Sequence, residues 1–126
     1  MIIGLGTDIV EIERVGDVIE RHGDRFLEQC FTPAEIQWAG RFKDKSVRFA
    51  GRWAAKEAVV KVLGTGFVRG VSFQDIEVLP LPTGQPQVSL TGGALKMAGQ
   101  LGIDHVLISI SHSHDYAVAT AIGVGA

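Results

Sequence analysis

The sequence predicts an α+β fold in which a small antiparallel sheet packs with a long central helix and shorter helices. Helical spacing of apolar residues dominates the first half of the chain. Short β-branched segments that alternate in polarity dominate the second half. Because the helices gather early and the antiparallel strands late, the pattern differs from that of a doubly wound parallel sheet.

The composition indicates one compact domain that spans residues 1–126. With 46% hydrophobic residues the chain is too apolar for a disordered protein, and no apolar run approaches the roughly 20 residues of a membrane span. The single cysteine, Cys30, excludes an intrachain disulfide, and the N-terminus lacks a signal-peptide pattern, so we expect a cytoplasmic protein. The net charge of -2 argues against a general nucleic-acid binder.

The N-terminus is expected to form a strand and then a helix. The first seven residues are apolar and rich in isoleucine, and the face with Gly4, Gly6 and Asp8 is thin enough for another backbone or a ligand to approach. Residues 10–21 follow with apolar side chains at helical spacing, and Gly23 marks the end of this helix.

Two more helices are predicted before residue 65. Thr32 and Glu35, with a proline at the first helical position between them, have the spacing of a capping box. The longest helical stretch covers residues 45–63, and Gly64 can supply the left-handed residue that ends it. One face of this helix is apolar and consists of Val47, Ala50, Ala54, Ala58 and Val62.

The second half of the chain predicts a hairpin, a helix and an antiparallel pair. The helix is capped by Thr91 and ends before Gly102. The strand-like segments are residues 71–79 and 87–90, which form the hairpin, and residues 105–111 and 116–123, which form the pair.

Glu57 and Lys61 are the first candidates for chemistry. They lie one helical turn apart on a face otherwise made of alanines, with no bulky neighbours, whereas Lys56 points about a quarter-turn away. A carboxylate and an ammonium so placed could hold a divalent cation and neutralise a phosphate. Asp8 could be a second ligand, because magnesium takes one or two carboxylates together with water and phosphate oxygens. The structural alternatives are an exposed Glu57–Lys61 pair and a helix N-cap at Asp8.

A row of cations is the second candidate feature. Arg14, Val18 and Arg21 share one side of the first helix, and Arg25 continues the row if that helix persists past Gly23. Such a row could dock an acidic helix, although a solvated face beside acidic residues is the alternative.

The closing turn and the glycines after the long helix carry weaker signals. His112 and His114 flank Ser113, where a phosphate contact or a general-base role would fit, although a histidine in a polar turn is usually just exposed. The backbone of Gly64-Thr65-Gly66 could approach a phosphate, but no Walker pattern and no zinc-ligand spacing is present.

Taken together, four stretches resemble the holo-acyl-carrier-protein synthases, the small 4'-phosphopantetheinyl transferases of fatty acid synthesis. The KEAxxK element that contains Glu57 and Lys61 is the most specific part, and the resemblance covers nearly the whole chain. Trp53 departs from it, because the family commonly has phenylalanine there. The four stretches are GTDIVEIER (6–14), FTPAE (31–35), GRWAAKEAVVKVLGTG (51–66) and ISHSHDYA (110–117).

This resemblance implies transfer of phosphopantetheine from coenzyme A to a serine of an apo acyl carrier protein, with release of adenosine 3',5'-bisphosphate. It implies magnesium at Asp8 and Glu57, and a pyrophosphate contact at Lys61. It also implies a homotrimer with sites between subunits. Coenzyme contacts are implied at Gly64, Ser111 and His112, and carrier docking at Arg14, Val18, Arg21 and Arg25.

We further predict that Glu57, directly or through a metal-bound water, removes the serine proton. Two other functions are alternatives: a hydrolase that uses Asp8, Glu57 and Lys61, and a binding module in which Asp8 and Glu57 are only structural. A metal-dependent phosphohydrolase would attack with water and need no docking helix. A noncatalytic module would bind an acidic partner through its arginines and ignore magnesium.

Overall fold

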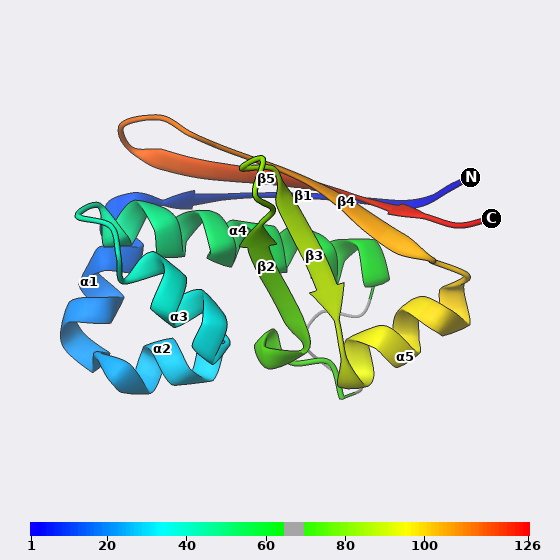
Figure 1. Ribbon diagram of the computed structural model, residues 1–126, viewed down its shortest axis with the longest axis horizontal. Helices are drawn as coiled ribbons and strands as arrows, with labels where there is room; N and C mark the ends of the chain where they lie inside the picture. The colour runs from blue at the N-terminus through cyan, green and yellow to red at the C-terminus, as the bar shows by residue number, and fades with distance from the viewer. Residues whose placement is uncertain (65–69) are drawn as a thin grey trace.

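The computed structural model describes residues 1–64 and 70–126 and has the predicted α+β architecture (Figure 1). Three antiparallel strands form one sheet in the order β1–β5–β4. They are β1 (Ile2–Glu11), β4 (His105–His112) and β5 (Tyr116–Val124). Both chain ends lie at the same end of this sheet, where the Met1 ammonium donates to the carbonyl oxygen of Gly125 (Figure 1).

The long helix α4 (Lys45–Leu63) has the predicted bounds and lies under one face of the sheet (Figure 1). Glycines in β1 allow the two backbones to meet. A Cβ at Gly6 would collide with the carbonyl oxygen of Ala58, and one at Gly4 would lie 2.9 Å from that of Val62. The thin face of the first strand is therefore covered by a helix backbone, as the alternation of glycines allows. Gly64, at φ 73°, ends α4.

Three short helices form a layer beside the first half of α4. They are α1 (Ile12–His22), α2 (Asp24–Cys30) and α3 (Pro33–Ala39). Gly23 ends α1 as predicted, at φ 53°, but α2 begins at the next residue and was not predicted. The capping box of α3 is confirmed, because Glu35 and Thr32 each accept a hydrogen bond from the other's backbone N–H.

Asp8 lies inside β1, opposite Ala119 of β5, and α1 begins only at Ile12. The alternative that Asp8 caps the first helix is therefore wrong. Its carboxylate is not committed to a helix terminus and remains available for other partners.

The β2–β3 hairpin (Ile76–Pro80 and Pro86–Leu90) and α5 (Gly92–Leu101) complete the fold. The strand expected from Val71 begins later, because residues 73–75 form the 3-10 helix η1, closed by a bond from the Ser72 N–H to Asp75. Gly102 ends α5 at φ 78°, and the N-cap residue Thr91 makes no side-chain capping bond among the described residues.

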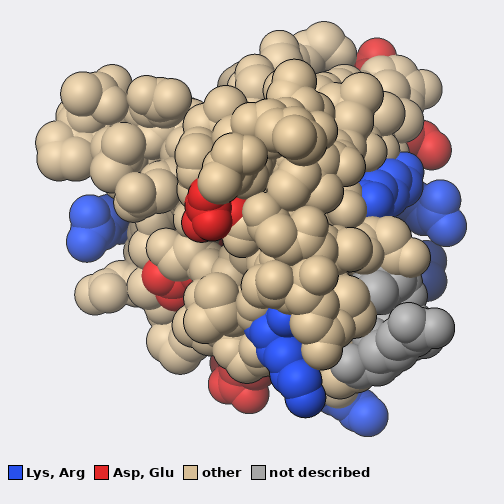
Figure 2. Space-filling model, turned by 90° about the vertical axis from the view of Figure 1, so that its right-hand side faces the viewer, with Lys and Arg blue, Asp and Glu red and all other residues tan. Residues whose placement is uncertain are grey.

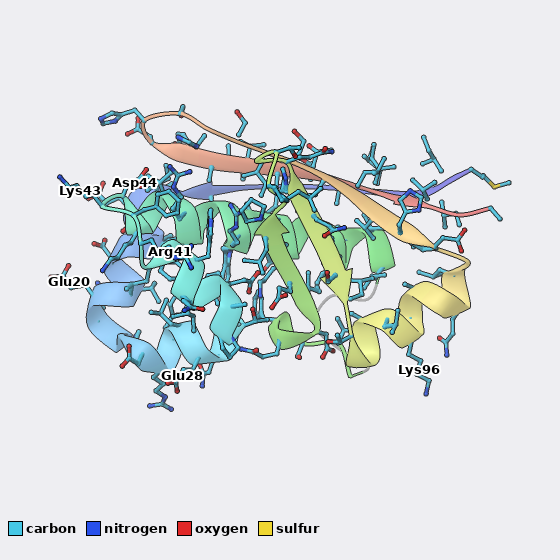
Figure 3. All side chains as sticks on the ribbon, in the orientation of Figure 1. Glu20, Glu28, Arg41, Lys43, Asp44 and Lys96 are labelled. Atoms are coloured by element: carbon cyan, nitrogen blue, oxygen red, sulfur yellow. The ribbon has the colours of Figure 1, made fainter. Side chains whose placement is uncertain are left out.

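Apolar side chains fill two clusters around α4. One lies between α4, the sheet, the hairpin and α5, and the other lies between α4 and the α1–α3 layer. Charged side chains such as Glu20, Glu28 and Lys96 point away from this body (Figure 3). Within residues 1–64 and 70–126, no helix is both long enough and apolar enough to cross a membrane.

Candidate active site

Asp8 and Glu57 line one pocket of about 350 Å³, which we call the acidic pocket. Asp8 comes from β1 and Glu57 from α4, two elements held in contact at Gly6. The Asp8 side chain is 19% exposed and Glu57 is half-buried. Two carboxylates from separate elements thus share a partly enclosed space that solvent can enter.

Lys61 adds a cation to this site. Its Nζ donates to the carbonyl oxygen of Thr7 at 2.7 Å and lies 3.3 Å from Asp8 Oδ1. The structural alternative required an ion pair between Lys61 and Glu57 on the same helix. In the described part of the chain Lys61 pairs instead with Asp8 on β1. Because 53% of the Lys61 side chain is exposed, the ammonium can also reach an incoming anion.

The pKa of Glu57 is raised above its usual value. Burial is the main cause, the negative charge of Asp8 adds to it, and the ammonium of Lys61 opposes it. A carboxylate with a raised pKa is a better proton acceptor near neutral pH than an ordinary one.

The acidic pocket has an apolar end, which the sequence did not predict. Trp53 and Phe26 line it together with Val15 and Val18, so the expectation that Glu57 has no bulky neighbours is wrong. The indole of Trp53 stacks on Phe73 with ring centres 4.8 Å apart and lies 5.9 Å from Phe26. Aromatic side chains from α2 and α4 therefore form one wall of the pocket, and Phe73 packs against Trp53.

The predicted docking row is only partly continuous. Arg14 and Val18 line the acidic pocket, whereas Arg21 is exposed further along α1. Arg25 lies on α2 beside His22 and Phe26, because α1 does not continue past Gly23. The row therefore spans two helices, with Arg14 and Val18 nearest the carboxylates.

Ser111 and His112 lie on β4, the edge strand opposite β1. Val10 and His112 both face Ala117 of the intervening β5, so their backbones are about 10 Å apart. Neither Ser111 nor His112 lines the acidic pocket. Gly64 lies one turn beyond Lys61, while Thr65 and Gly66 lie outside the described residues.

His112 instead lines a second cavity of about 200 Å³ with Arg48 and Arg52, which we call the basic pocket. Arg52 is buried, lies 3.8 Å from the Trp38 ring centre and donates to the carbonyl oxygen of Val78. Burial lowers its pKa to about 10, with Glu35 opposing the shift and Arg48 adding to it. Sequence reasoning missed both arginines, although their i, i+4 spacing was a usable signal.

Lys56 was also missed as a buried residue. Its Nζ lies 2.6 Å from Glu35 Oε1, and the two side chains are 0% and 1% exposed. Burial lowers the pKa of Lys56, and Glu35 opposes that shift. Lys56 is therefore an interior partner of α3 and does not belong to either pocket.

The model of the 4'-phosphopantetheinyl transferase superfamily matches residues 4–121. The chain belongs to this superfamily. That membership confirms the resemblance and the expectation of an enzyme that transfers phosphopantetheine. The match includes both carboxylates of the acidic pocket and the complete sheet except for its outermost residues.

Similar proteins have the same length and fold. A holo-[acyl-carrier-protein] synthase of Shewanella amazonensis is 48% identical over 96% of this chain and 97% of its own length, and one of Solibacter usitatus is 43% identical over 97% and 98%. The structure of the synthase of Neisseria meningitidis has a TM-score of 0.90 and 31% identity, covering 98% of this chain and 99% of that one. A Helicobacter pylori synthase in complex with coenzyme A has a TM-score of 0.84 and 33% identity, covering 95% and 99%.

Proposed function

We propose that this protein transfers the 4'-phosphopantetheine group of coenzyme A to a serine of an apo acyl carrier protein. The products are the holo carrier and adenosine 3',5'-bisphosphate. The observation that carries the proposal is that Asp8 and Glu57 share their pocket with Arg14 and Val18. With these roles, the phosphate chemistry would take place beside a basic docking surface, as transfer to an acidic carrier requires. The coenzyme A complex of the Helicobacter pylori relative supports the choice of donor.

We propose Asp8 and Glu57 as the protein ligands of a magnesium ion. Two carboxylates fit this ion, which takes its remaining ligands from water and substrate phosphate. No group of three or more metal-ligating side chains occurs in residues 1–64 and 70–126, which disfavours a closed zinc-type site there. When bound, magnesium would offset the charge of the pyrophosphate.

Glu57 and Lys61 each have a role in the transfer step. The serine oxygen forms a bond to the β-phosphorus, and the bond from that phosphorus to the leaving adenosine bisphosphate oxygen breaks. Glu57, which lines the acidic pocket, accepts the serine proton. Lys61 offsets negative charge on the pyrophosphate, since half of its side chain is exposed.

We propose that Gly64, Ser111 and His112 contact the coenzyme. The basic pocket supports this assignment, because Arg48 and Arg52 place two further cations beside His112. A coenzyme carries several phosphate charges, and guanidinium groups bind phosphate well. Arg14, Val18, Arg21 and Arg25 would contact the carrier protein.

We further propose a homotrimer with sites between subunits. Within one chain the acidic pocket lies at the β1 edge of the three-stranded sheet and the basic pocket at the β4 edge, so a neighbouring subunit would have to join them. The outer face of the sheet supports association, because Leu5, Ile9 and Leu107 are each at least half exposed. At the end of the molecule that carries the termini and α5, mostly uncharged side chains cover the upper part of the surface, and acidic and basic side chains lie below it and at its edges (Figure 2).

Complementation tests the shared site. Glu57→Gln and His112→Ala are each expected to be nearly inactive, but mixed trimers would place an intact Glu57 beside an intact His112. Random assembly at equal amounts should restore about a quarter of the sites. No recovery in trimers shown to be mixed, or a monomer by light scattering, would exclude this arrangement.

Intact mass spectrometry tests the reaction itself. We expect an apo acyl carrier protein to gain one phosphopantetheine in the presence of coenzyme A and magnesium, and not with a chelator. Asp8→Ala should abolish the gain, whereas Lys96→Ala, on the exposed side of α5, should not. Cleaved coenzyme with an unmodified carrier would indicate a phosphohydrolase, and an intact coenzyme with a bound but unmodified carrier would indicate a binding module.

We propose that residues 1–126 form one transferase domain that acts in the cytoplasm, in fatty acid synthesis. The transfer would supply the prosthetic group on which acyl chains are carried.

A further inference from the structure

Lys56 belongs to the most specific motif of the sequence, yet the proposed chemistry does not use it. Its ammonium is enclosed: it pairs with Glu35 Oε1 at 2.6 Å and donates to the carbonyl oxygen of Phe73 at 2.9 Å. Glu35 also accepts hydrogen bonds from the backbone N–H groups of Thr32 and Val78, each at 2.8 Å. This ion pair therefore joins four segments, which are α3, α4, η1 and β2.

The ion pair is connected to the acidic pocket through aromatic rings. Lys56 holds the backbone of Phe73, whose ring stacks on Trp53 at an interplanar angle of 29°. Trp53 lines the acidic pocket together with Glu57. The neighbouring Gln74 also binds η1 to α2, because its amide donates to the carbonyl oxygens of Glu28 and Phe31. The 3-10 helix η1 thus contacts Trp53, which forms part of the pocket wall.

We propose that Lys56 and Glu35 are positioning residues that hold Phe73 against Trp53 and thereby set the apolar end of the acidic pocket, where the carrier protein docks. The inference rests on the proposed function. A buried ion pair adds little net stability over an apolar pair of similar size, whereas its directed bonds fix geometry. Since the charge of Lys56 is matched by Glu35 in the interior, it is not directed at the coenzyme phosphates.

The test separates geometry from stability. Lys56→Met leaves Glu35 charged and buried without its partner, so its thermal midpoint should fall strongly. The double variant Lys56→Met with Glu35→Gln removes both charges and should recover part of that loss, because the amide oxygen can still accept one of the two backbone N–H bonds. Both are made in a Trp38→Phe background, in which Trp53 is the only tryptophan and its emission reports on the pocket wall.

In the double variant, we expect red-shifted Trp53 emission, stronger acrylamide quenching and a several-fold higher KM for the carrier protein. The KM for coenzyme A should stay unchanged. An emission and a carrier KM equal to those of the Trp38→Phe background, at a recovered midpoint, would overturn the proposal, and so would a rise confined to the KM for coenzyme A.

Two further variants keep the test decisive if Lys56→Met does not fold. Phe73→Leu keeps the carbonyl that Lys56 binds but removes the stacked ring, so it should reproduce the emission shift and the raised carrier KM. Met97→Ala, which trims a partly buried side chain on α5, should lower the midpoint without changing either. Emission and quenching need no substrate, so they test the positioning even if the protein transfers nothing, an outcome that would refute the proposed function alone.

Discussion

Gly6→Ala tests whether close packing of β1 on α4 assembles the acidic pocket. A Cβ at Gly6 would collide with the Ala58 carbonyl oxygen and lie 2.9 Å from the Cβ of Lys61. Because the atom in the way belongs to the backbone, the strand must move away from the helix. Overpacking typically lowers the free energy of unfolding by about 1–3 kcal/mol, and we expect a value near the upper end of that range. Alanine also lowers the conformational entropy of the unfolded chain, which raises the free energy of unfolding by about 0.4–1 kcal/mol. We expect a net loss of about 2 kcal/mol.

Urea unfolding measures this loss, and Gly99→Ala is the matched control. Gly99 lies in α5 with open space where a Cβ would project, so alanine should raise the free energy of unfolding there by about 0.5–1 kcal/mol. Transfer activity gives a second measurement. Asp8 lies on the same strand as Gly6, so a displaced strand carries it away from Glu57 and should lower kcat beyond the unfolded fraction.

A Gly6→Ala protein with wild-type stability and kcat would refute this reasoning. It would mean that β1 and α4 can separate freely without disturbing the carboxylates. A loss of stability with an unchanged kcat would refute only the second step, which makes the position of Asp8 depend on the contact at Gly6.

Three other changes give distinct outcomes. Glu57→Gln should abolish transfer yet raise the thermal midpoint of the metal-free protein at pH 7. The folded pKa of Glu57 is raised, so its ionisation costs stability as pH rises from the ordinary carboxyl value through the raised one; a lower midpoint would contradict this. Arg14→Glu should raise the KM for the carrier several-fold and weaken its salt dependence, while Lys96→Glu at the far end of the molecule should do neither (Figure 3). Thr32→Ala removes the cap of α3 and a 2.6 Å bond to Glu77, and should cost about 1–2 kcal/mol in urea unfolding.

The elements that could be predicted from the sequence are those with local signals. The bounds of α4 follow from apolar spacing and from Gly64, and α3 follows from the capping box. The meeting of β1 with α4 was also foreseeable, because two glycines alternate on one strand face. By contrast, α2 was missed because it has only 7 residues and follows α1 with a single glycine between them.

The site was predictable only where one element already held the signal. Glu57 and Lys61 are neighbours on one helix, and Asp8 could be added because the glycines near it allow contact. Trp53 and Phe26 were not foreseen as pocket walls, because they meet only when α2 folds back on α4. Their contact depends on tertiary packing, which no local spacing encodes.

The contact between Lys56 and Glu35 also could not be predicted from local sequence. Helical geometry predicts that Lys56 points away from Glu57, and for a lysine the usual expectation is then exposure to solvent. The capping box fully explains Glu35 from local sequence, so nothing in that segment calls for a second partner. In the structure the same carboxylate caps α3, accepts from β2 and neutralises Lys56. Adjacent charged residues of a single motif therefore lie in different surroundings, because Glu57 lines the acidic pocket and Lys56 pairs with Glu35 in the interior.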